Sequence, residues 1–308
     1  MKVNIFKYTF VVFLGILPFG TKSQSNESLV EMHRLAKLNS RSSNYISTPL
    51  NAPLHNESNT LFEAGIYANL KLINNSQDPN SLKYKYADFD FNMFLTLRMY
   101  NEFSSPIYPL NYQPGFNYIK FFKPNKNTYS YLDFEIKHLS NGQSGTFYRP
   151  ETDSFNLATG DFSTNYLSVK YTRIHKIKDF RLFQTYGFRI DGGIPNSILS
   201  LESELKQSYG IYRLMADFQG ISPSFSILKS DKQFLLIGRI ENTYILGDLS
   251  EYHSEQKYRY SLKAKLSLYP AEGIRFGGFI QYYTGRDYYN VRFINNISVL
   301  SLGLTFNL

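Results

Sequence analysis

A histidine, a serine and a glycine lie close together between His138 and Ser144, in a segment that reads His-Leu-Ser-Asn-Gly-Gln-Ser. Residues two apart on a β-strand point to the same face, so His138 and Ser140 would lie side by side on a strand. A hydroxyl beside an imidazole is the pairing that serine esterases use, because the imidazole takes the hydroxyl proton as the oxygen attacks a carbonyl. The segment predicts an acyl-transfer site.

The strand that would carry this pair has two chemically different faces. Phe134 and Ile136 continue the face of His138 and Ser140, whereas charged residues such as Lys137 lie on the opposite face. In a soluble enzyme such a pair would lie in a polar cleft, but here it extends an apolar stripe. The pattern favours a barrel wall with lipid outside and a polar lumen inside, with the serine on the lipid side.

Asn165, on a later segment, has similar surroundings. Leu167, Val169 and Tyr171 alternate with it along one apolar or amphipathic face, and the residues between them are more polar. Asn165 would therefore also lie on the lipid side of the wall.

Alternation with a period of two continues from residue 59 to the end of the chain, and Tyr and Phe, which favour strands, number 26 each. The strands are long enough to cross a membrane at a tilt, and aromatic residues recur near their ends. The last one, Ser298–Phe306, ends almost at the C-terminus, as the closing strand of an outer-membrane barrel does. We therefore predict an all-β fold, a transmembrane antiparallel β-barrel of about twelve strands. The strands are expected near 59–73, 83–99, 111–123, 129–140, 161–175, 180–191, 207–217, 222–230, 232–246, 257–269, 272–284 and 288–307.

The N-terminal part has a different composition. Lys2 and Lys7 precede an apolar run from Tyr8 to Phe19, which predicts a signal peptide over 1–24, with a retained anchor as the alternative. Residues 25–57 read as a short N-terminal periplasmic arm with one amphipathic helix followed by irregular chain. The barrel domain would then span 58–308.

Charge and cysteine content narrow the classes of partner. The net charge is +8, but the basic residues are scattered along alternating strand positions, which suits a lumen lining or contact with anionic headgroups better than a nucleic-acid interface. We therefore expect no nucleic-acid partner. The chain has no cysteine, which excludes a disulfide scaffold, a thiolate metal site and a lipidated N-terminal cysteine.

Three segments in order resemble the outer-membrane phospholipase A family. The segment His138–Ser144 resembles the family's His-x-Ser-Asn-Gly-Arg-Ser motif, with Gln143 in place of the arginine. Upstream, Ser104-Ser105-Pro106 and Asn111-Tyr112-Gln113-Pro114 resemble the family's Ser-Ser-Pro…Asn-Tyr-Glu-Pro segment. The run from Gly285 to Gly303 resembles its last hairpin. Together these points cover most of residues 83–308.

The resemblance implies a triad of Ser140 as nucleophile, His138 as base and Asn165 as the group that orients the imidazole, with the Gly142 N–H as oxyanion donor. It implies hydrolysis of acyl esters of glycerophospholipids and lysophospholipids, at either acyl position. It also implies location in the outer membrane of a Gram-negative bacterium.

The resemblance further implies calcium at a reversible homodimer interface. By position, its ligands would be the backbone carbonyl of Gln143, the side chain of Asp161 and Ser104 of a second copy. Asp161 stands where the family has a serine, and a carboxylate is a good hard-oxygen ligand. Asp153 or Ser163 are alternatives to Asp161, because the loop from Gly145 to Gly160 is longer than the family's.

Other readings use the same barrel without this chemistry. A passive channel would depend on the charged lumen and would not need His138 or Ser140. An adhesive barrel would act through its outer loops, and a catalytically inactive relative would keep the barrel and lose activity.

Overall fold

The computed structural model describes residues 43–50, 60–74, 87–104, 107–122, 127–177, 182–193, 209–226, 232–247, 249, 259–271 and 276–306. The expected signal peptide over 1–24 lies outside the described residues. No helix in the described part of the chain is long and apolar enough to cross a membrane.

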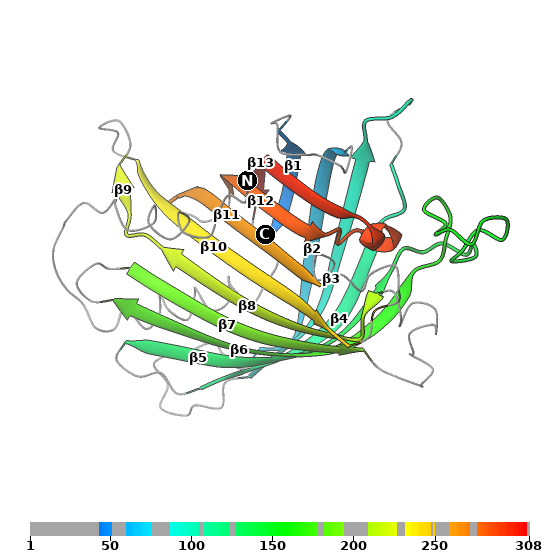
Figure 1. Cartoon of the computed structure of the whole chain (residues 1–308). Helices are drawn as coiled ribbons and strands as arrows, with labels where there is room; N and C mark the ends of the chain where they lie inside the picture. Colours follow the sequence, from blue (N-terminus) through cyan, green and yellow to red (C-terminus); the bar gives the residue numbers. More distant parts are fainter. Residues whose placement is uncertain are drawn as a thin grey trace, which may run out of the picture.

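The strands form one closed antiparallel barrel (Figure 1). Neighbours along the chain pair with each other, β1 pairs with β13, and β8 pairs with β10, so that twelve strands close the ring and confirm the predicted fold class. The thirteenth, β9, pairs only with the start of β10. The strands are β1 (Asn44–Pro49), β2 (Thr60–Asn74), β3 (Ala87–Tyr100), β4 (Asn111–Phe121), β5 (Thr128–Ser140), β6 (Ser163–Ile177), β7 (Leu182–Gly193), β8 (Tyr212–Ile221), β9 (Phe225–Ser226), β10 (Gln233–Leu246), β11 (Tyr260–Pro270), β12 (Phe276–Arg286) and β13 (Asn296–Phe306).

The two faces of the wall divide as the alternation predicts. In the middle of β5 and β6 the outward side chains include large, exposed apolar ones, with Ile136 51% exposed and Leu167 52% exposed. The inward ones, such as Asp133 and Ser168, are buried. A closed ring satisfies the strand hydrogen bonds within the wall, which is the condition for spanning lipid. The outer surface therefore suits a hydrocarbon environment.

Charged side chains cross-link the inner face of the barrel. Glu135 Oε1 lies 3.0 Å from Lys137 Nζ, and Glu135 Oε2 lies 3.2 Å from an Nη atom of Arg189. Lys170 Nζ lies 2.8 Å from Asp217 Oδ1 on β8. Ion pairs therefore form within and between strands on the lumen side of the wall.

Two apolar clusters lie inside the barrel, one near each end. The first packs the ends of β4, β6 and β8 against the starts of β5, β7 and β10; it comprises Ile119, Phe121, Tyr129, Tyr131, Ile174 and Ile221, with Phe183 and Ile237. The second, called here the mouth cluster, packs the β5–β6 loop against Tyr209 and the β12–β13 connection; its buried members are Leu139, Phe147, Phe162, Tyr166, Tyr209 and Phe293. Side chains therefore fill both ends of the lumen.

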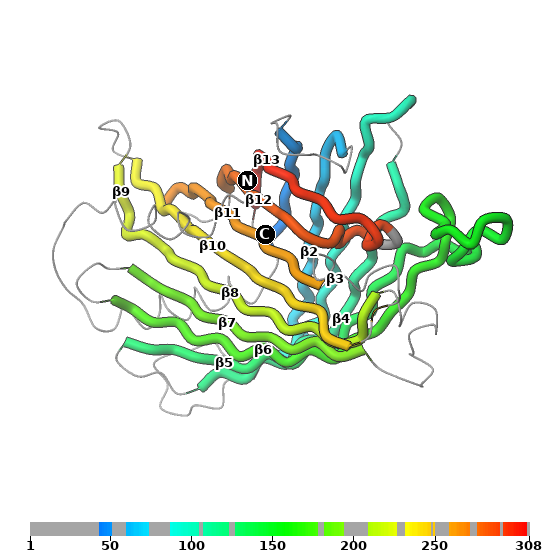
Figure 2. The backbone as a smooth tube through the Cα atoms, in the orientation of Figure 1, coloured from blue at the N-terminus to red at the C-terminus, as the bar shows by residue number. Residues whose placement is uncertain are grey.

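The barrel ends differ in their connections. The segments 101–104, 107–110, 141–162 and 287–295 lie at one end, where β5 stops, and the β5–β6 loop projects from it (green in Figures 1 and 2). The last segment contains a short 3₁₀ helix, η6 (Asn290–Ile294). The start of β1 and the end of β13 lie at the opposite end, since these strands pair antiparallel from Asn44 with Phe306. Longer loops outside and termini inside are usual in outer-membrane barrels.

The structure corrects several predicted boundaries. Part of the segment 25–57, expected to be irregular, is β1, which pairs with both β13 and β2, so the barrel begins at Asn44 rather than at residue 58. The strand expected over 222–230 is present as the two-residue β9, and 227–230 lie outside the described residues. The strand expected over 288–307 begins at Asn296, after η6.

Candidate active site on the outer wall

His138 and Asn165 lie directly opposite each other in the β5–β6 ladder. Their side chains both point outward, and His138 Nδ1 lies 2.9 Å from Asn165 Oδ1. An amide oxygen can only accept, so this hydrogen bond places the imidazole proton on Nδ1 and leaves Nε2 as a proton acceptor. The predicted pairing of these two residues therefore has the geometry of a base and its orienting group.

Ser140 lies on the same outward face of β5, two residues beyond His138 and opposite Ser163 of β6. It is half-buried, and in the described part of the chain its hydroxyl and His138 are not hydrogen-bonded. Such bonds are often long in unliganded sites and tighten when substrate binds. Ser140 thus lies on the same outer face as the imidazole, at the end of β5.

Gly142 lies just past the end of β5 in the left-handed region, with φ = +65°. Glycine adopts this conformation without the steric penalty that a Cβ would bring. Within the described residues, the Gly142 N–H makes no hydrogen bond. An exposed N–H two residues after the candidate nucleophile is available for a developing oxyanion.

Tyr112 also borders the site, which the sequence analysis did not predict. It lies opposite Ser140 in the β4–β5 ladder. A Cβ built at Gly142 would lie 3.3 Å from Tyr112 Cε2, so the ring packs beside the oxyanion turn. The resemblance segment contained Tyr112, but only the strand register brings it next to Ser140.

The candidate calcium ligands lie in two loops. Asp161 is half-buried two residues before Ser163, and its N–H donates to the carbonyl oxygen of Gly145 at 2.9 Å, which ties it to the segment that carries Gln143. Asp153 is exposed at the loop tip, in the turn closed by Arg149. Asp161 and Ser163 are therefore better placed near Ser140 than Asp153 is.

Ser104 is exposed on the β3–β4 loop, with φ = +64°. No hydrogen bond joins it to the β5–β6 loop in the described structure. The described residues also contain no cluster of three or more His, Cys, Asp or Glu side chains that could hold a metal. The three predicted ligands are nevertheless a carbonyl, a carboxylate and a hydroxyl, which are the hard oxygen donors that calcium prefers.

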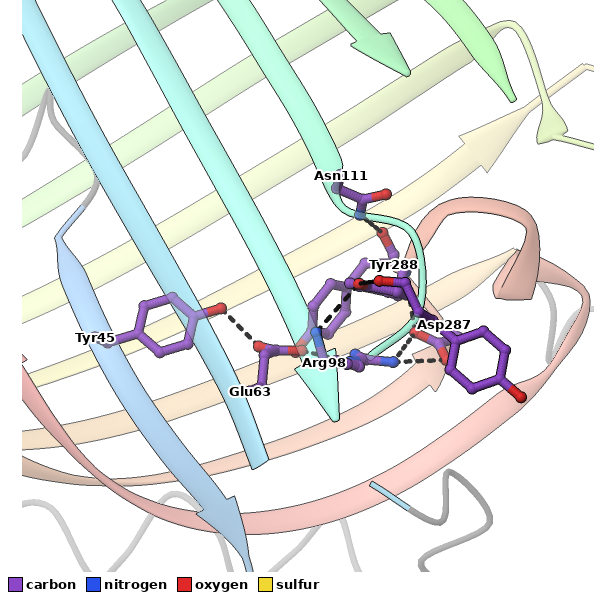
Figure 3. Close-up of polar contacts among 8 residues, drawn as sticks. Tyr45, Glu63, Arg98, Asn111, Asp287 and Tyr288 are labelled. Carbon is purple, nitrogen blue, oxygen red and sulfur yellow. Dashed lines mark hydrogen bonds and ion pairs between the residues drawn. The ribbon is translucent and has the colours of Figure 1, made fainter. Parts of the chain in front are cut away.

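A second polar cluster lies on the inner face at the same end of the barrel (Figure 3). It is called here the Arg98 cluster and comprises Glu63, Arg98, Asp287, Tyr288 and Tyr289. Arg98 Nε donates to Glu63 Oε2 at 2.5 Å, and Arg98 Nη1 donates to both Asp287 oxygens at 2.8 and 2.9 Å. The Tyr288 hydroxyl donates to Glu63 at 2.8 Å. The cluster attaches the β12–β13 connection to β2 and β3.

Burial dominates the electrostatics of this connection. Burial raises the pKa of the Asp287 carboxyl, although Arg98 pulls it the other way. Burial and the charge of Glu63 raise the pKa of the Tyr288 hydroxyl well above its ordinary value. Burial likewise raises the pKa of Tyr289, whose hydroxyl accepts from the Arg98 backbone N–H at 3.1 Å. These groups bind the β12–β13 connection to β2 and β3 on the inner side of the wall.

No protein-family model matches the sequence. No curated protein matches it significantly. Solved structures do share its fold. Outer membrane phospholipase A from Escherichia coli aligns with a TM-score of 0.52 at 14% identity, over 86% of this chain and 90% of that one. The Salmonella typhi outer membrane phospholipase dimer with bound calcium aligns with a TM-score of 0.53 at 13% identity, over 86% of this chain and 91% of that one. The chain therefore has the fold of a multi-pass outer-membrane barrel.

Proposed function

We propose that this barrel, which shares the fold of outer membrane phospholipase A, is an outer-membrane phospholipase that hydrolyses acyl esters of glycerophospholipids and lysophospholipids at either acyl position. The observation that carries the proposal is the His138–Asn165 hydrogen bond on the outward face of β5 and β6, with Ser140 on the same face. A passive channel would work through its lumen and an adhesive barrel through its outer loops, so neither function needs this pair on the outer wall. A lipid ester reaches the outer wall directly, without leaving the membrane.

The geometry supports an acyl-transfer mechanism. Ser140 Oγ attacks the ester carbonyl while His138 Nε2 takes its proton, and Asn165 Oδ1 keeps the Nδ1 proton in place. The Gly142 N–H donates to the carbonyl oxygen as negative charge develops there. His138 then gives the proton to the departing alcohol, which leaves as the lysophospholipid. Water, deprotonated by His138, releases the fatty acid from Ser140.

Calcium and a reversible homodimer belong to the same proposal. Gln143, through its carbonyl, and Asp161 would hold the ion beside the oxyanion turn, with Ser104 supplied by a second copy. A calcium ion bound there adds positive charge near the developing oxyanion. The chemistry of the three donors supports calcium, and the Salmonella enzyme was solved as a dimer with calcium bound.

The passive-channel reading receives less support. The mouth cluster fills the lumen at the site end, with Phe162 and Phe293 fully buried, and a second apolar cluster fills the other end. Ion pairs occupy the space between them. A solute path through the described lumen would have to displace these side chains.

The deciding experiment is fatty-acid release from mixed phospholipid micelles by the refolded protein, with calcium or with a chelator. We expect calcium-dependent release that Ser140→Ala abolishes. The matched control is Ser130→Ala, since Ser130 lies on the same outward face of β5 near its other end. Release that is equal in Ser140→Ala, or absent in a barrel with normal heat-modifiable gel migration, would favour an inactive relative or a channel.

The calcium requirement has its own test. Chelation should abolish activity and dimerisation together, measured by turnover and by cross-linking of the same sample. Asp161→Ala should raise the calcium concentration needed for half-maximal activity, with Glu151→Ala, at an exposed position of the same loop, as the control. Undiminished turnover in chelator would remove calcium from the mechanism, and an unchanged titration for Asp161→Ala would place the side-chain ligand elsewhere.

A further inference from the structure

We propose that Asn141 is a positioning residue for the proposed ester hydrolysis, and that its buried carboxamide fixes the turn that aims the Gly142 N–H at the oxyanion. The inference rests on the proposed function and adds a residue to it. Asn141 follows directly after Ser140, but its side chain points inward and is only 2% exposed. It cannot touch a lipid substrate on the outer wall.

A buried carboxamide is costly unless its polar atoms are paired, and here they are. Asn141 Oδ1 accepts from the backbone N–H of Gln143 at 3.2 Å and from that of Phe162 at 3.0 Å. Asn141 Nδ2 donates to the carbonyl oxygen of Gly160 at 2.8 Å. The backbone N–H of Asn141 donates to the Phe162 carbonyl oxygen at 3.0 Å.

The contact with Gln143 sets the direction of the turn. A side-chain oxygen that accepts from the N–H two residues later closes an Asx turn. Here the turn encloses Gly142, whose φ of +65° reverses the chain. The Gln143 N–H is thereby held inward, while the Gly142 N–H keeps no partner among the described residues. One carboxamide thus selects which of the two N–H groups remains available outside.

The other two contacts fix the turn relative to β6. Gly160 and Phe162 lie just before Ser163, where β6 begins, and Asn165 follows on that strand. The carboxamide therefore joins the end of the strand that carries Ser140 to the start of the strand that carries Asn165. A displacement of about 1 Å at such a point lowers a rate by about 100-fold, because the donor no longer meets the transition state.

Asn141→Asp is the sharpest substitution. It keeps the size of the side chain and both acceptor contacts, but it sets an oxygen against the Gly160 carbonyl where Nδ2 donates. Asn156→Asp is the matched control, because the Asn156 side chain also pairs with loop backbone, donating to the Thr146 carbonyl oxygen at 3.1 Å and accepting from the Thr159 N–H at 3.2 Å. The Asn156 side chain bonds to Thr146 and Thr159 and makes no hydrogen bond to the turn at Gly142 among the described residues. Asn141→Ser serves as a partial rescue, since a hydroxyl can also close a turn on the N–H two residues later.

The experiment measures micelle hydrolysis together with labelling of Ser140 by a long-chain sulfonyl fluoride. The label counts competent sites, so kcat is expressed per labelled site. For Asn141→Asp we expect kcat to fall about 10- to 100-fold with KM within twofold and full final labelling. Asn156→Asp should match the wild type, and Asn141→Ser should fall between Asn141→Ala and the wild type.

Failure of the Asn141 role can be distinguished from failure of the proposed ester hydrolysis. If the wild type hydrolyses lipid through Ser140 and Asn141→Asp loses activity only in proportion to its labelled fraction, Asn141 is structural and the inference is wrong. The same holds if Asn141→Ser does no better than Asn141→Ala. If the wild type shows no Ser140-dependent hydrolysis, the proposed function fails, and the positioning role fails with it.

Discussion

The outer site and the Arg98 cluster lie at the same end of the barrel, on opposite faces of its wall. The outer site is made of uncharged polar side chains, whereas the Arg98 cluster contains paired charges. The outer site consists of a hydroxyl, an imidazole and a carboxamide, with Ser140 and His138 half-buried. The Arg98 cluster consists of a guanidinium between two carboxylates, with Arg98 only 2% exposed. The wall separates the uncharged polar groups on its outer face from the buried charges on its inner face.

Alternation lets a single strand, β5, contribute to the outer site on one face and to the packed interior on the other. Leu139, between His138 and Ser140, points inward into the mouth cluster. Packing on the inner face therefore holds the backbone from which the reactive side chains project outward. The outward side chains of β5 therefore do not have to stabilise the fold, because the inward side chains supply the packing.

The largest expected effect breaks the outer site alone. His138→Ala removes the proposed base, and loss of one member of a catalytic triad lowers turnover by about 10⁴-fold or more. The thermal stability should stay within error, because the side chain is half-buried on the lipid face. Micelle hydrolysis and heat-modifiable gel migration check both statements. His175→Ala is the control, a histidine near the other end of β6, and equal turnover in the two variants would exclude His138 as the base.

The next effect breaks the inner cluster alone. Arg98→Ala leaves Glu63 and Asp287 as unpaired buried carboxylates, and breaking such a buried pair costs about 3–5 kcal/mol. We expect a lower unfolding midpoint in urea, with kcat per sulfonyl-fluoride-labelled site unchanged. Arg149→Ala, at an exposed position of the β5–β6 loop, should have no effect on stability. A fall in kcat per site would mean that the two faces are coupled.

A smaller effect sharpens the description of the outer site. Asn165→Ala removes the acceptor for His138 Nδ1, so the imidazole loses its fixed tautomer and orientation. Because a neutral amide orients less strongly than a carboxylate, we expect kcat to fall about 100-fold, less than the roughly 10⁴-fold loss on replacing a triad aspartate. Turnover of Asn242→Ala, another outer-wall asparagine, is the comparison. A loss as large as that of His138→Ala would give Asn165 a further role.

The smallest effect uses pH to weaken the inner cluster. Burial raises the pKa of Tyr288 and Tyr289, so the folded state keeps protons that the unfolded state loses near pH 10. Stability from this source is complete below that pH and is lost as the pH rises above it. The unfolding midpoint should therefore decline above pH 10, and less steeply in Tyr288→Phe. An equally steep decline in that variant would assign the effect to other groups.

The sequence predicts the barrel well because alternation is local. The sequence of each spanning strand distinguishes its inner from its outer face, and His138 and Ser140 lie on one strand. Placing Asn165 beside His138 requires only the register between β5 and the next strand, β6. Long strands and short-range patterns are the features that a single sequence reports most directly.

The elements that were missed depend on distant partners. β1 is only six residues long and follows a region rich in Asn and Ser, so its alternation is too short to stand out. Arg98 meets Asp287 across 189 positions of sequence, and no periodicity connects them. Tyr112 enters the site through the β4–β5 register. β1 and the Arg98–Asp287 pair depend on closure of the ring, and Tyr112 depends on the register of two neighbouring strands, so a pattern within one strand reports none of them.

The shortness of β1 has a consequence for how the barrel is completed. Its register with β13 runs over six residue pairs, and that with β2 over three, whereas β12 and β13 pair over eleven. Both seams that β1 makes are therefore shorter than the seam between β12 and β13, and β1 joins β13 to β2 to close the ring. We therefore expect residues 44–49 to join the barrel last during assembly. Backbone amides of β1 should exchange with solvent fastest among the barrel strands, and losing this segment would leave β2 and β13 as open edges within the lipid.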